Sequence, residues 1–526
     1  MLRTTRTLSL FLFLAFCVYS QGVKAQGLTS HQIDSIANKS LELFPSAGVA
    51  VSVVKDGKLI HAKGYGYSSI ESKKAVDENT LFAIASNSKA FTVAALAILV
   101  DEGKLSWHDK VIDYIPEFTM YDSYVRANFT IEDLLCHRSG LGLGAGDLMI
   151  FPDGGDYTID DILKSFQYQK PVSAFRTKYD YDNLLYIVAG EIIHRISGIT
   201  WAEFVESRIM KPLGMDSSVS SFERLKDKTN LALPHSSESG EMKQIEAYSC
   251  SLTDAAGGIN SSVNDLSRWL LVQLNGGKYG DNLEKELFSE ASQKEMWKLH
   301  TMMTFSAKGS ERYQNHYQAY GLGWVIKDYK AYTIISHTGG LPGMLSKTLV
   351  IPELNLGVAV LTNSIPGGTT YFTLPQAIID SYIGAEPKDW NAYASERLSG
   401  ENRMVDSVVN AVWETVEKAK SFPINFEDYT GTYEDNWFGA VEVYSKDDQL
   451  WFKSLRSPKL VGRMQYYKGT TFAVKWNYAA MNCDAFATFN LDQEGKAVLI
   501  KMNGISPNID FSFDFHDLEL KRVKKN

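Results

Sequence analysis

Strand-like segments occur at both ends of the first 385 residues, and a helix-rich segment separates them. Aromatic and β-branched residues mark a hairpin over residues 48–67, and similar runs return over residues 321–363. Residues 104–310 between them carry helical patterns that begin at Thr, Ser or Asp and end at Gly. We therefore expect one antiparallel sheet built from both ends of the domain, flanked by helices and with an inserted helical lobe, which is an α+β fold.

The chain changes character after residue 385. Residues 386–422 are polar and helix-prone, which is typical of a connector. From residue 423 to 526, short β-rich runs such as TFAVKW, AVLIKM and FSFDF alternate with turn residues, so the sequence predicts a separate small β-barrel. We expect residues 26–385 to form one domain and 423–526 an independent folding unit, whose deletion leaves a soluble first domain.

The first 25 residues predict a secretory signal peptide. A basic start with Arg3 and Arg6 precedes a short apolar run and a small residue, Ala25. No later segment holds some twenty uninterrupted apolar residues. The sequence thus predicts an exported protein, periplasmic or secreted, with no stable membrane span after cleavage.

Charge and cysteine content exclude several classes of function. Loss of the signal peptide removes three basic residues and no acid, which takes the net charge from −9 to −12. Such an acidic protein is poorly suited to bind nucleic acid or an anionic membrane. Cys136, Cys250 and Cys483 are few and widely spaced, so neither a disulfide framework nor a zinc site is predicted. We expect no metal and no organic cofactor.

The segment from Leu81 to Glu102 carries the main chemical motif, Ser86-x-x-Lys89. One helical turn separates the two residues, so their side chains project onto the same face if Ser86 begins the helix. A lysine among apolar helix residues is partly desolvated, which favours its neutral, proton-accepting form. The motif predicts a serine nucleophile next to a base, although a serine at a helix start is also a common cap.

The same two-residue pattern occurs a second time, at Ser52 and Lys55. This copy lies in the predicted hairpin, where residues three apart point to opposite faces of a strand. Only the copy at Ser86 can bring its two side chains together.

Two further motifs offer partners for Ser86. Tyr181-Asp182-Asn183 precedes a helical pattern; Asp182 can be a cap there, while a tyrosine hydroxyl and an amide can relay a proton and orient a carbonyl. His337-Thr338-Gly339-Gly340 follows an apolar strand pattern, and we expect it to close that strand at the edge of a cleft. A histidine in such a position can also be purely structural.

The three motifs together resemble those of the serine β-lactamase and penicillin-binding-protein superfamily, closest to its class C β-lactamase-like branch of D-peptidases, esterases and transesterases. The resemblance covers residues 30 to 385 and extends to LLCHRSGL (134–141), KPLGM (211–215), AAGGINSSVNDLSRW (255–269) and HTGGLPGMLS (337–346). The β-rich C-terminal segment resembles the lipocalin-like barrel that follows the catalytic domain in some members.

The resemblance implies a role for each motif residue. Ser86 would be the acylated nucleophile, with Lys89 and Tyr181 sharing proton transfer. Asn183 would order the network and hold the substrate, together with His337, Thr338 and Gly339. Backbone N–H groups of Ser86 and Gly340 would form the oxyanion hole.

His337 departs from the family pattern, in which a lysine usually begins the third motif. A lysine offers a permanent charge to a substrate carboxylate, whereas histidine is largely neutral at pH 7. We therefore expect weak β-lactam hydrolysis, and a preference for carboxylate substrates that grows as the pH falls and the imidazole becomes charged.

The sequence therefore predicts an exported serine hydrolase that cleaves an amide or ester in a small molecule or peptide through a Ser86 acyl-enzyme. Two alternatives remain at this point. The acyl group can pass to a small-molecule alcohol or amine, which would make the protein an acyltransferase. A non-catalytic binding or sensor protein is the other, with the barrel as its binding module. Substrate and oligomeric state are not encoded in any motif.

Overall fold

A computed structural model describes residues 27–44, 46–237, 241–304, 315–365 and 369–524. The predicted signal peptide lies outside these residues. Within them, no helix combines the length and the apolar character needed to cross a membrane.

The first domain is organised around a nine-stranded antiparallel sheet with the order β10-β11-β12-β13-β14-β15-β1-β2-β3. Strand β1 (Gly48–Lys55) pairs on one side with β2 (Lys58–Ser69) and on the other with β15 (Leu356–Thr362). Segments some three hundred residues apart in sequence are therefore neighbours, as the split strand pattern predicts. The α+β fold with an antiparallel sheet and an inserted helical lobe is confirmed.

The remaining strands of this sheet follow from the edge inward. They are β10 (Thr301–Met302), β11 (Gln318–Tyr320), β12 (Val325–Tyr329), β13 (Tyr332–Leu341), β14 (Met344–Ile351) and, at the other edge, β3 (Lys74–Ala75). His337 lies in the middle of β13, which corrects the prediction that it closes the strand. The strand continues because its glycines remain paired with β14, Gly339 opposite Ser346 and Gly340 opposite Leu345.

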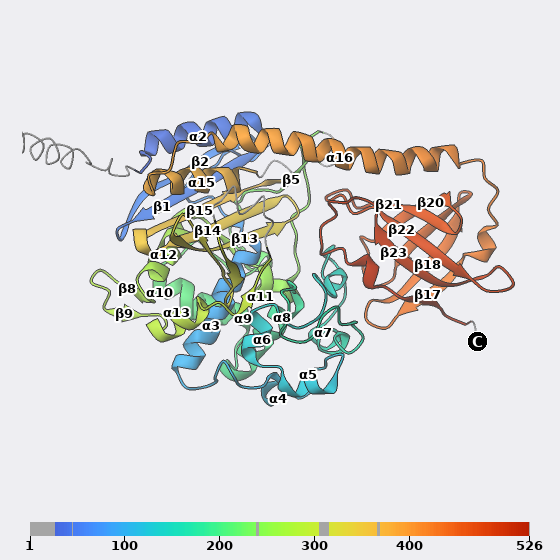
Figure 1. The fold of residues 1–526 in the computed structure, drawn as a ribbon, viewed down its shortest axis with the longest axis horizontal. Helices are drawn as coiled ribbons and strands as arrows, with labels where there is room; N and C mark the ends of the chain where they lie inside the picture. The colour runs from blue at the N-terminus through green and yellow to red at the C-terminus, as the bar shows by residue number, and fades with distance from the viewer. Residues whose placement is uncertain (1–26, 45, 238–240, 305–314, 366–368, 525–526) are drawn as a thin grey trace, which may run out of the picture.

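Helices cover both faces of the sheet. On one face α2 (Ser30–Leu43) and α15 (Thr370–Tyr382) pack over the valines and leucines of β1, β14 and β15 (Figure 1). On the other face lie α12 (Val263–Leu274) and α3 (Ser88–Asp101). Every side chain of α3 from Ser88 to Leu99 is buried, so this helix is the centre of the domain rather than an amphipathic surface helix.

The helical lobe occupies the space beyond α3. Its helices are α4 (Val111–Tyr114), α5 (Ser123–Asn128), α6 (Ile131–Leu135), α7 (Ile159–Ser165), α8 (Leu184–Ser197), α9 (Trp201–Val205), α10 (Lys211–Leu213), α11 (Asp254–Gly257) and α13 (Glu290–Met296). Two-stranded pairings complete it, namely β4 (Phe82–Ala83) with β7 (Asn260–Ser261) and β8 (Lys278–Tyr279) with β9 (Lys285–Glu286). Strands β5 (His235–Ser236), β6 (Lys243–Gln244) and β16 (Ser364–Ile365) form a further small sheet.

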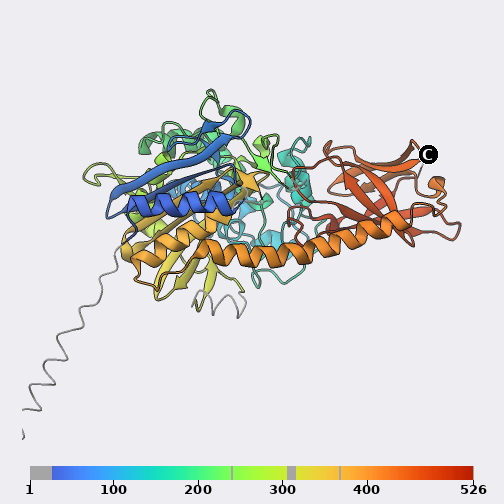
Figure 2. The ribbon, with the colours of Figure 1, turned by 90° about the horizontal axis from the view of Figure 1, so that it is seen from above.

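A single long helix, α16 (Trp390–Lys418), connects the two domains (Figures 1 and 2). Its first residue is anchored to the first domain, since the Trp390 indole N–H donates to Asp380 Oδ2 at 2.7 Å. Near its other end, Val412 and Val416 pack against Ala473 and Ile505 of the barrel. The predicted helical connector is thus a rod of roughly 43 Å that touches both domains.

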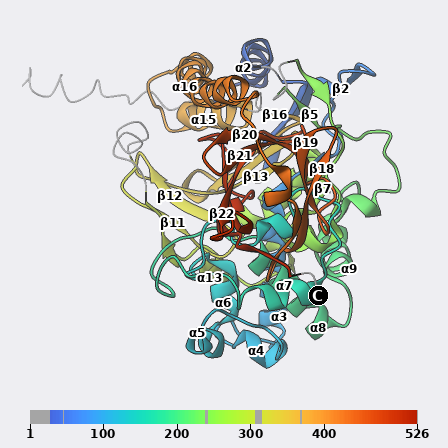
Figure 3. The ribbon, with the colours of Figure 1, turned by 90° about the vertical axis from the view of Figure 1, so that its right-hand side faces the viewer.

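The C-terminal domain is a closed barrel of eight strands, at the right of Figure 1 and turned toward the viewer in Figure 3. The strands are β17 (Gly431–Asp435), β18 (Gly439–Lys446), β19 (Gln449–Ser454), β20 (Val461–Lys468), β21 (Thr471–Trp476), β22 (Ala485–Leu491), β23 (Ala497–Gly504) and β24 (Leu520–Arg522). The predicted small β-barrel is confirmed. Buried aromatic rings of Tyr433, Phe472 and Phe489 pack against one another in its core. This packing gives no support to a barrel that binds a ligand in its interior.

One of the β-rich runs predicted from the sequence is a loop and not a strand. FSFDF, residues 511–515, alternates as a strand does, but it belongs to the loop between β23 and β24 and ends in a 3-10 turn at Phe515–Asp517. Phe513 and Phe515 are buried, and Phe515 stacks on Trp476 of the barrel, whereas Phe511 is partly exposed and reaches across to the first domain.

Candidate active site

Ser86 lies in a tight turn at the centre of the first domain. Strand β4 leads into a single 3-10 turn, Ala85–Asn87, and α3 begins directly after it. Ala85 has a φ of 50°, a left-handed conformation that is unfavourable for a residue with a side chain. The turn therefore presents Ser86 through a strained backbone that its surroundings must hold in place.

The neighbouring strands hold this turn. A Cβ atom at Gly339 of β13 would lie 2.1 Å from the carbonyl oxygen of Ile84, so only glycine allows the strand to pass so close. The Asn87 side chain donates to Ser346 Oγ at 2.7 Å and accepts from Thr348 Oγ1 at 2.6 Å. These bonds fasten the serine turn to β14.

Lys89 projects from α3 onto the same side as Ser86. Its Nζ donates to Ser86 Oγ at 3.2 Å, to Asn183 Oδ1 at 2.7 Å and to the carbonyl oxygen of Ala256 at 2.9 Å. The one-turn spacing thus brings the two side chains together. These three hydrogen bonds together fix the position of the Lys89 Nζ atom.

Burial sets the protonation of Lys89. Desolvation lowers its pKa to about 7, against the opposing influence of Asp147 and Asp182. A substantial fraction of the side chain is therefore neutral near pH 7. A neutral amine next to a serine hydroxyl can accept its proton.

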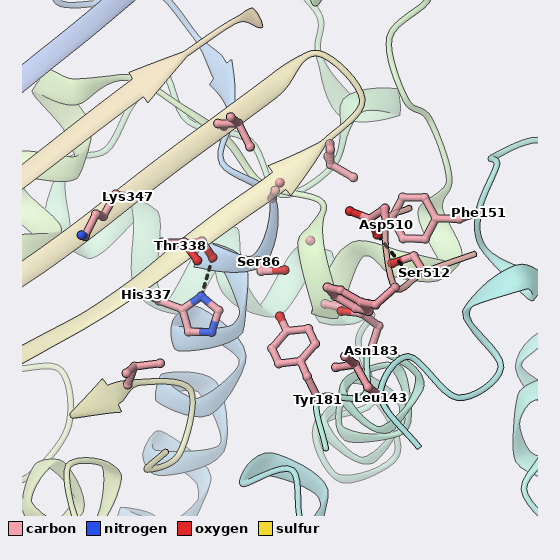
Figure 4. Close-up of a pocket in the computed structure, with 18 of the residues that line it drawn as sticks. Ser86, Leu143, Phe151, Tyr181, Asn183, His337, Thr338, Lys347, Asp510 and Ser512 are labelled. Carbon is pink, nitrogen blue, oxygen red and sulfur yellow. Dashed lines mark hydrogen bonds between the residues drawn. The ribbon is translucent and has the colours of Figure 1, made fainter. Parts of the chain in front are cut away.

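Tyr181 lies on the cleft side of the same pair. Its hydroxyl points toward Ser86 (Figure 4), and its ring centroid is 4.8 Å from Lys89 Nζ. Burial raises the pKa of Tyr181 well above its usual range, although a hydrogen bond with Ser86 opposes this. Tyr181 therefore stays protonated, which suits a proton relay and not a phenolate base.

Asn183 occupies the N-terminal end of α8 and links Lys89 to a buried acid. Its Nδ2 donates to Asp147 Oδ2 at 2.7 Å, while its Oδ1 accepts from Lys89. These two bonds leave one orientation for the amide. Asp182 caps α8 by accepting from the Leu185 N–H at 3.3 Å, as the sequence allows.

His337 lines the cavity in a neutral state. Its Nδ1–H donates to the Thr338 carbonyl oxygen at 2.6 Å, so its Nε2 accepts from the Tyr320 hydroxyl at 2.8 Å. Burial, and then the nearby Lys89, lower the pKa of His337 to about 3. The expectation that this imidazole becomes charged in mildly acidic solution is therefore wrong, because the site disfavours the cation strongly.

The cavity around Ser86 has a volume of about 530 Å³. The motif residues that line it are Ser86, Tyr181, Asn183, His337, Thr338 and Gly340. Gly339 contributes through the close approach described above. The structure thus brings together every residue that the sequence assigned to the site.

The barrel contributes one wall of this cavity, through residues that no sequence motif marked. Asp510 and Ser512 of the β23–β24 loop line the same cavity (Figure 4), and so does Phe511 between them. The Phe511 ring meets that of Tyr181 edge-on, with centroids 5.7 Å apart. Further apolar side chains surround this end of the cavity, namely Leu143, Ile150, Phe151, Tyr248 and Met481.

A buried acid fixes the barrel loop in this position. Asp514 accepts from the backbone N–H groups of Gly146 at 2.8 Å and Leu148 at 2.9 Å. These residues flank Asp147, the partner of Asn183. Burial raises the pKa of both Asp147 and Asp514 well above the usual range. Two hydrogen bonds therefore connect the barrel loop to the Asn183 amide that positions Lys89. One joins Asp514 to the backbone beside Asp147, and the other joins Asp147 to Asn183.

His137 is a further residue that the motif analysis left without a role. Its ring lies 4.3 Å from that of Tyr181, and its Nδ1 accepts from the Asp182 N–H at 3.1 Å. Burial lowers its pKa well below the usual range. Its ring packs against that of Tyr181. The sequence signal that could have pointed to His137 is its position in LLCHRSGL, a stretch that resembles the family.

Comparison with known protein families shows which family this chain belongs to. The family model described as Beta-lactamase matches residues 43–381, more than half of the chain. The chain belongs to the β-lactamase family. Members of this family are serine hydrolases, and we class the chain with them. A second model, a domain of unknown function (DUF3471), matches residues 417–522 and thus covers the barrel.

Individual relatives of this β-lactamase-family chain include an enzyme and two solved structures. Unguisins hydrolase ungD' of Aspergillus campestris is 28% identical over 76% of this chain and 74% of its own length. An octameric penicillin-binding protein homologue from Pyrococcus abyssi is 20% identical, with a TM-score of 0.60 over 91% of this chain and 99% of its own. The D-amino acid amidase from Ochrobactrum anthropi, solved with D-phenylalanine, is 21% identical, with a TM-score of 0.55 over 67% of this chain and 97% of its own.

Proposed function

We propose that this protein hydrolyses an amide or ester bond through an acyl-enzyme on Ser86. The observation that carries the proposal is the contact of 3.2 Å between Lys89 Nζ and Ser86 Oγ, with a lysine whose pKa is lowered to about 7. A buried, partly neutral amine at hydrogen-bonding distance is a base suited to activate a serine.

The side chains support a complete cycle. Lys89 accepts the proton of Ser86 as Oγ attacks the substrate carbonyl carbon, and the N–H groups of Ser86 and Gly340 hold the oxyanion. Tyr181 relays the proton to the leaving amine or alkoxide, the C–N or C–O bond breaks, and the acyl group remains on Ser86. Water then attacks the ester, loses its proton to the same network, and releases an acid and free Ser86.

The shape of the cavity favours an acyl group with an apolar side chain. Phe511, Phe151, Tyr248 and Met481 form a mainly apolar end next to Ser86. One relative is named as a hydrolase and a related structure as a D-amino acid amidase, and these names favour hydrolysis of an amide. We therefore propose peptide-like amides with an aromatic or large aliphatic residue on the acyl side.

The decisive test is covalent labelling of Ser86. The protein is treated with a fluorophosphonate, a penicillin and a series of activated esters, and its intact mass is measured. We expect one fluorophosphonate adduct and one acyl adduct from esters of apolar acids. Ser86→Ala should abolish both, whereas Ser52→Ala, in the other Ser-x-x-Lys copy, should label like wild type. Labelling that survives in Ser86→Ala rules Ser86 out as the nucleophile.

Acyl transfer is separated from hydrolysis in the same assay. Adding an alcohol or amine acceptor converts product from free acid to ester or amide only if the acceptor competes with water at the acyl-enzyme. Mainly free acid at millimolar acceptor supports the hydrolase assignment.

We further propose that the protein acts outside the cytoplasm, on the strength of residues 1–25 alone. The mature N-terminus should then be Gln26 when the full chain is expressed with its leader, as N-terminal mass analysis will tell.

A further inference from the structure

A second cavity, of about 740 Å³, lies between the two domains and adjoins the Ser86 cavity. Tyr248 and Pro342 line both cavities. The barrel loop between β21 and β22 also borders both, since Met481 lines the Ser86 cavity and Ala480 lines the second one. The apolar end of the Ser86 cavity therefore shares its walls with this interdomain cavity.

One wall of the interdomain cavity is the edge of a strand. Residues 243–246, which begin with β6, all line it. Successive side chains of a strand point to opposite faces, so four consecutive residues that border one cavity present the edge of the chain to it. In its small sheet β6 is an outermost strand, in the order β16-β5-β6. The edge that borders the cavity is thus the one that β5 leaves open.

The hydrogen-bonding pattern of β6 directs main-chain groups to this edge. The Ile245 N–H donates to the Pro234 carbonyl oxygen at 2.9 Å, so these two residues form a hydrogen-bonded pair. Such pairs alternate along an antiparallel ladder, so the next pair, His235 with Gln244, is a non-hydrogen-bonded one. The His235 N–H agrees with this, because it donates to Asn363 on the other side of β5. The N–H and C=O of Gln244 therefore point away from β5, toward the cavity.

The barrel forms another wall of the interdomain cavity, and one of its lysines ties it to the first domain. Tyr478 lines this wall. Lys459 Nζ lies 2.9 Å from Asp153 Oδ1 and 2.9 Å from Glu246 Oε2, so it joins the barrel to two segments of the first domain. The charged residues in the described lining are two lysines and two acids, namely Lys243, Lys459, Asp153 and Glu246. A lining without net charge suits a neutral chain with hydrogen-bonding groups better than it suits an ion.

We propose that the interdomain cavity binds the part of a peptide substrate that precedes its acyl residue, as an extended strand added to the edge of β6. An open strand edge can bind a peptide in this way because its N–H and C=O groups complement those of an incoming chain. With the acyl side chain at Tyr248 and Met481, the preceding residues lie next to this edge. The substrate class is then a peptide with several residues before the cleaved bond and not a single amino acid amide, a refinement that rests on the proposed function.

The test compares two chromogenic amides, acetyl-phenylalanine 4-nitroanilide and acetyl-trialanyl-phenylalanine 4-nitroanilide, each with D- and with L-phenylalanine. Added main-chain hydrogen bonds should raise the kcat/KM of wild type for the longer amide at least about tenfold. Replacing one alanine at a time by N-methylalanine removes one N–H. The gain should then fall at alternate positions only, since every second N–H of an added strand faces its neighbour. A wild-type ratio near one, or the same effect at all three positions, overturns the proposal.

Substitutions on both walls repeat the comparison. Gln244→Pro removes the N–H that points to the cavity and no hydrogen bond to β5, so it should bring the ratio close to one. Gln244→Ala keeps that N–H and should keep most of the ratio. Tyr478→Ala opens the barrel wall and should lower the ratio, whereas Tyr124→Ala, at a tyrosine of α5 that is 70% exposed, is the matched control and should keep it. A ratio that is unchanged in both Gln244→Pro and Tyr478→Ala overturns the strand addition.

Binding to Ser86→Ala protein separates this inference from the proposed function. Calorimetry with the two amides measures affinity without turnover. The longer amide should bind at least about tenfold more tightly, and N-methylation at alternate positions should remove this gain. That result supports the subsite even if wild type cleaves neither amide or Gln244→Pro does not fold. Equal affinities overturn it. Absence of cleavage by wild type, by contrast, counts against the proposed amide hydrolysis.

Discussion

Phe511 of the barrel meets Tyr181 of the first domain edge to face, with ring centroids 5.7 Å apart. The contact makes the C-terminal domain part of the substrate cavity. Asp514, three residues later, secures the loop to the backbone beside Asp147, whose carboxylate accepts from the Asn183 amide that binds Lys89. The two domains also share one continuous apolar cluster. The independent folding of residues 423–526 stays a prediction, and deleting them would expose apolar surface that the first domain now shares with the barrel.

Phe511→Ala should change which substrates are accepted. Removing the ring enlarges the apolar end of the cavity and takes away an aromatic contact with the substrate, so we expect KM for an aromatic acyl ester to rise roughly tenfold. The kcat for an acetyl ester, which does not reach this wall, should change little. Steady-state kinetics on the two esters measures both effects. An equal loss on both substrates would place Phe511 in folding and not in selection.

The pH dependence of acylation should follow Lys89. Only neutral lysine accepts the serine proton, and its folded pKa of about 7 lies below the usual value. Hence kcat/KM for an uncharged ester should rise with pH by about tenfold per unit below 7 and level off above it. His337, with a pKa of about 3, adds no further step in this range.

Asp182→Asn tests whether the charge of Asp182 raises the pKa of Lys89. The Asp182 carboxylate raises the pKa of Lys89, and asparagine can still cap α8. The midpoint of the pH profile should therefore move to lower pH in the variant. A midpoint that stays fixed or rises would assign the titration to another group.

Tyr181→Phe tests the proton relay with little change in shape. The phenolic oxygen is lost, while the ring still packs against Phe511 and His137. Acylation by an amide should fall by about a hundredfold or more, because an amine leaving group needs a proton. Acylation by an ester with an acidic phenol leaving group should fall far less. Single-turnover kinetics distinguishes the two cases, and equal losses would contradict a relay role.

Gly339→Ala should destabilise the serine turn. The added Cβ would lie 2.1 Å from the Ile84 carbonyl oxygen and 2.4 Å from Ser346 Oγ, so strand and turn must separate. We expect a lower melting temperature, with a loss of about 1–3 kcal/mol as for other overpacked sites. Gly340→Ala is the matched control, since its Cβ would meet only Leu345 Cδ2 at 3.5 Å. Equal melting temperatures for the two variants would contradict this account.

The residues that sequence alone could place are those whose geometry is local. One helical turn relates Ser86 to Lys89, and Asn183 directly precedes α8, so spacing was sufficient to predict which way their side chains point. The antiparallel sheet was predictable because β-branched runs return at both ends of the domain. His337 was harder, since the strand end depends on pairing with β14 and not on the glycines themselves. Its neutral state depends on burial, which no motif encodes.

Contacts between distant segments were beyond reach. The FSFDF run has the alternation of a strand, yet it forms a loop in which Phe511 contacts Tyr181 of the first domain and Phe515 stacks on Trp476 of the barrel. Asp147 sits in a glycine-rich loop with no motif. Lys347 reads as an ordinary strand lysine until the fold places it in the cavity wall. In each case the partner comes from another part of the chain, and only tertiary packing identifies it.

The rod-like α16 has a consequence for how the enzyme comes into being. The ribosome adds Phe511 to the chain 330 residues after Tyr181, and α16 lies between the two in the sequence. If the first domain folds before the barrel, as its predicted independence allows, it holds Ser86 and Lys89 while the side of the cavity that Phe511 lines is still open. Such a chain would be acylated at Ser86 before it could select among acyl groups. Substrate selectivity would follow only when the last strands of the barrel have folded.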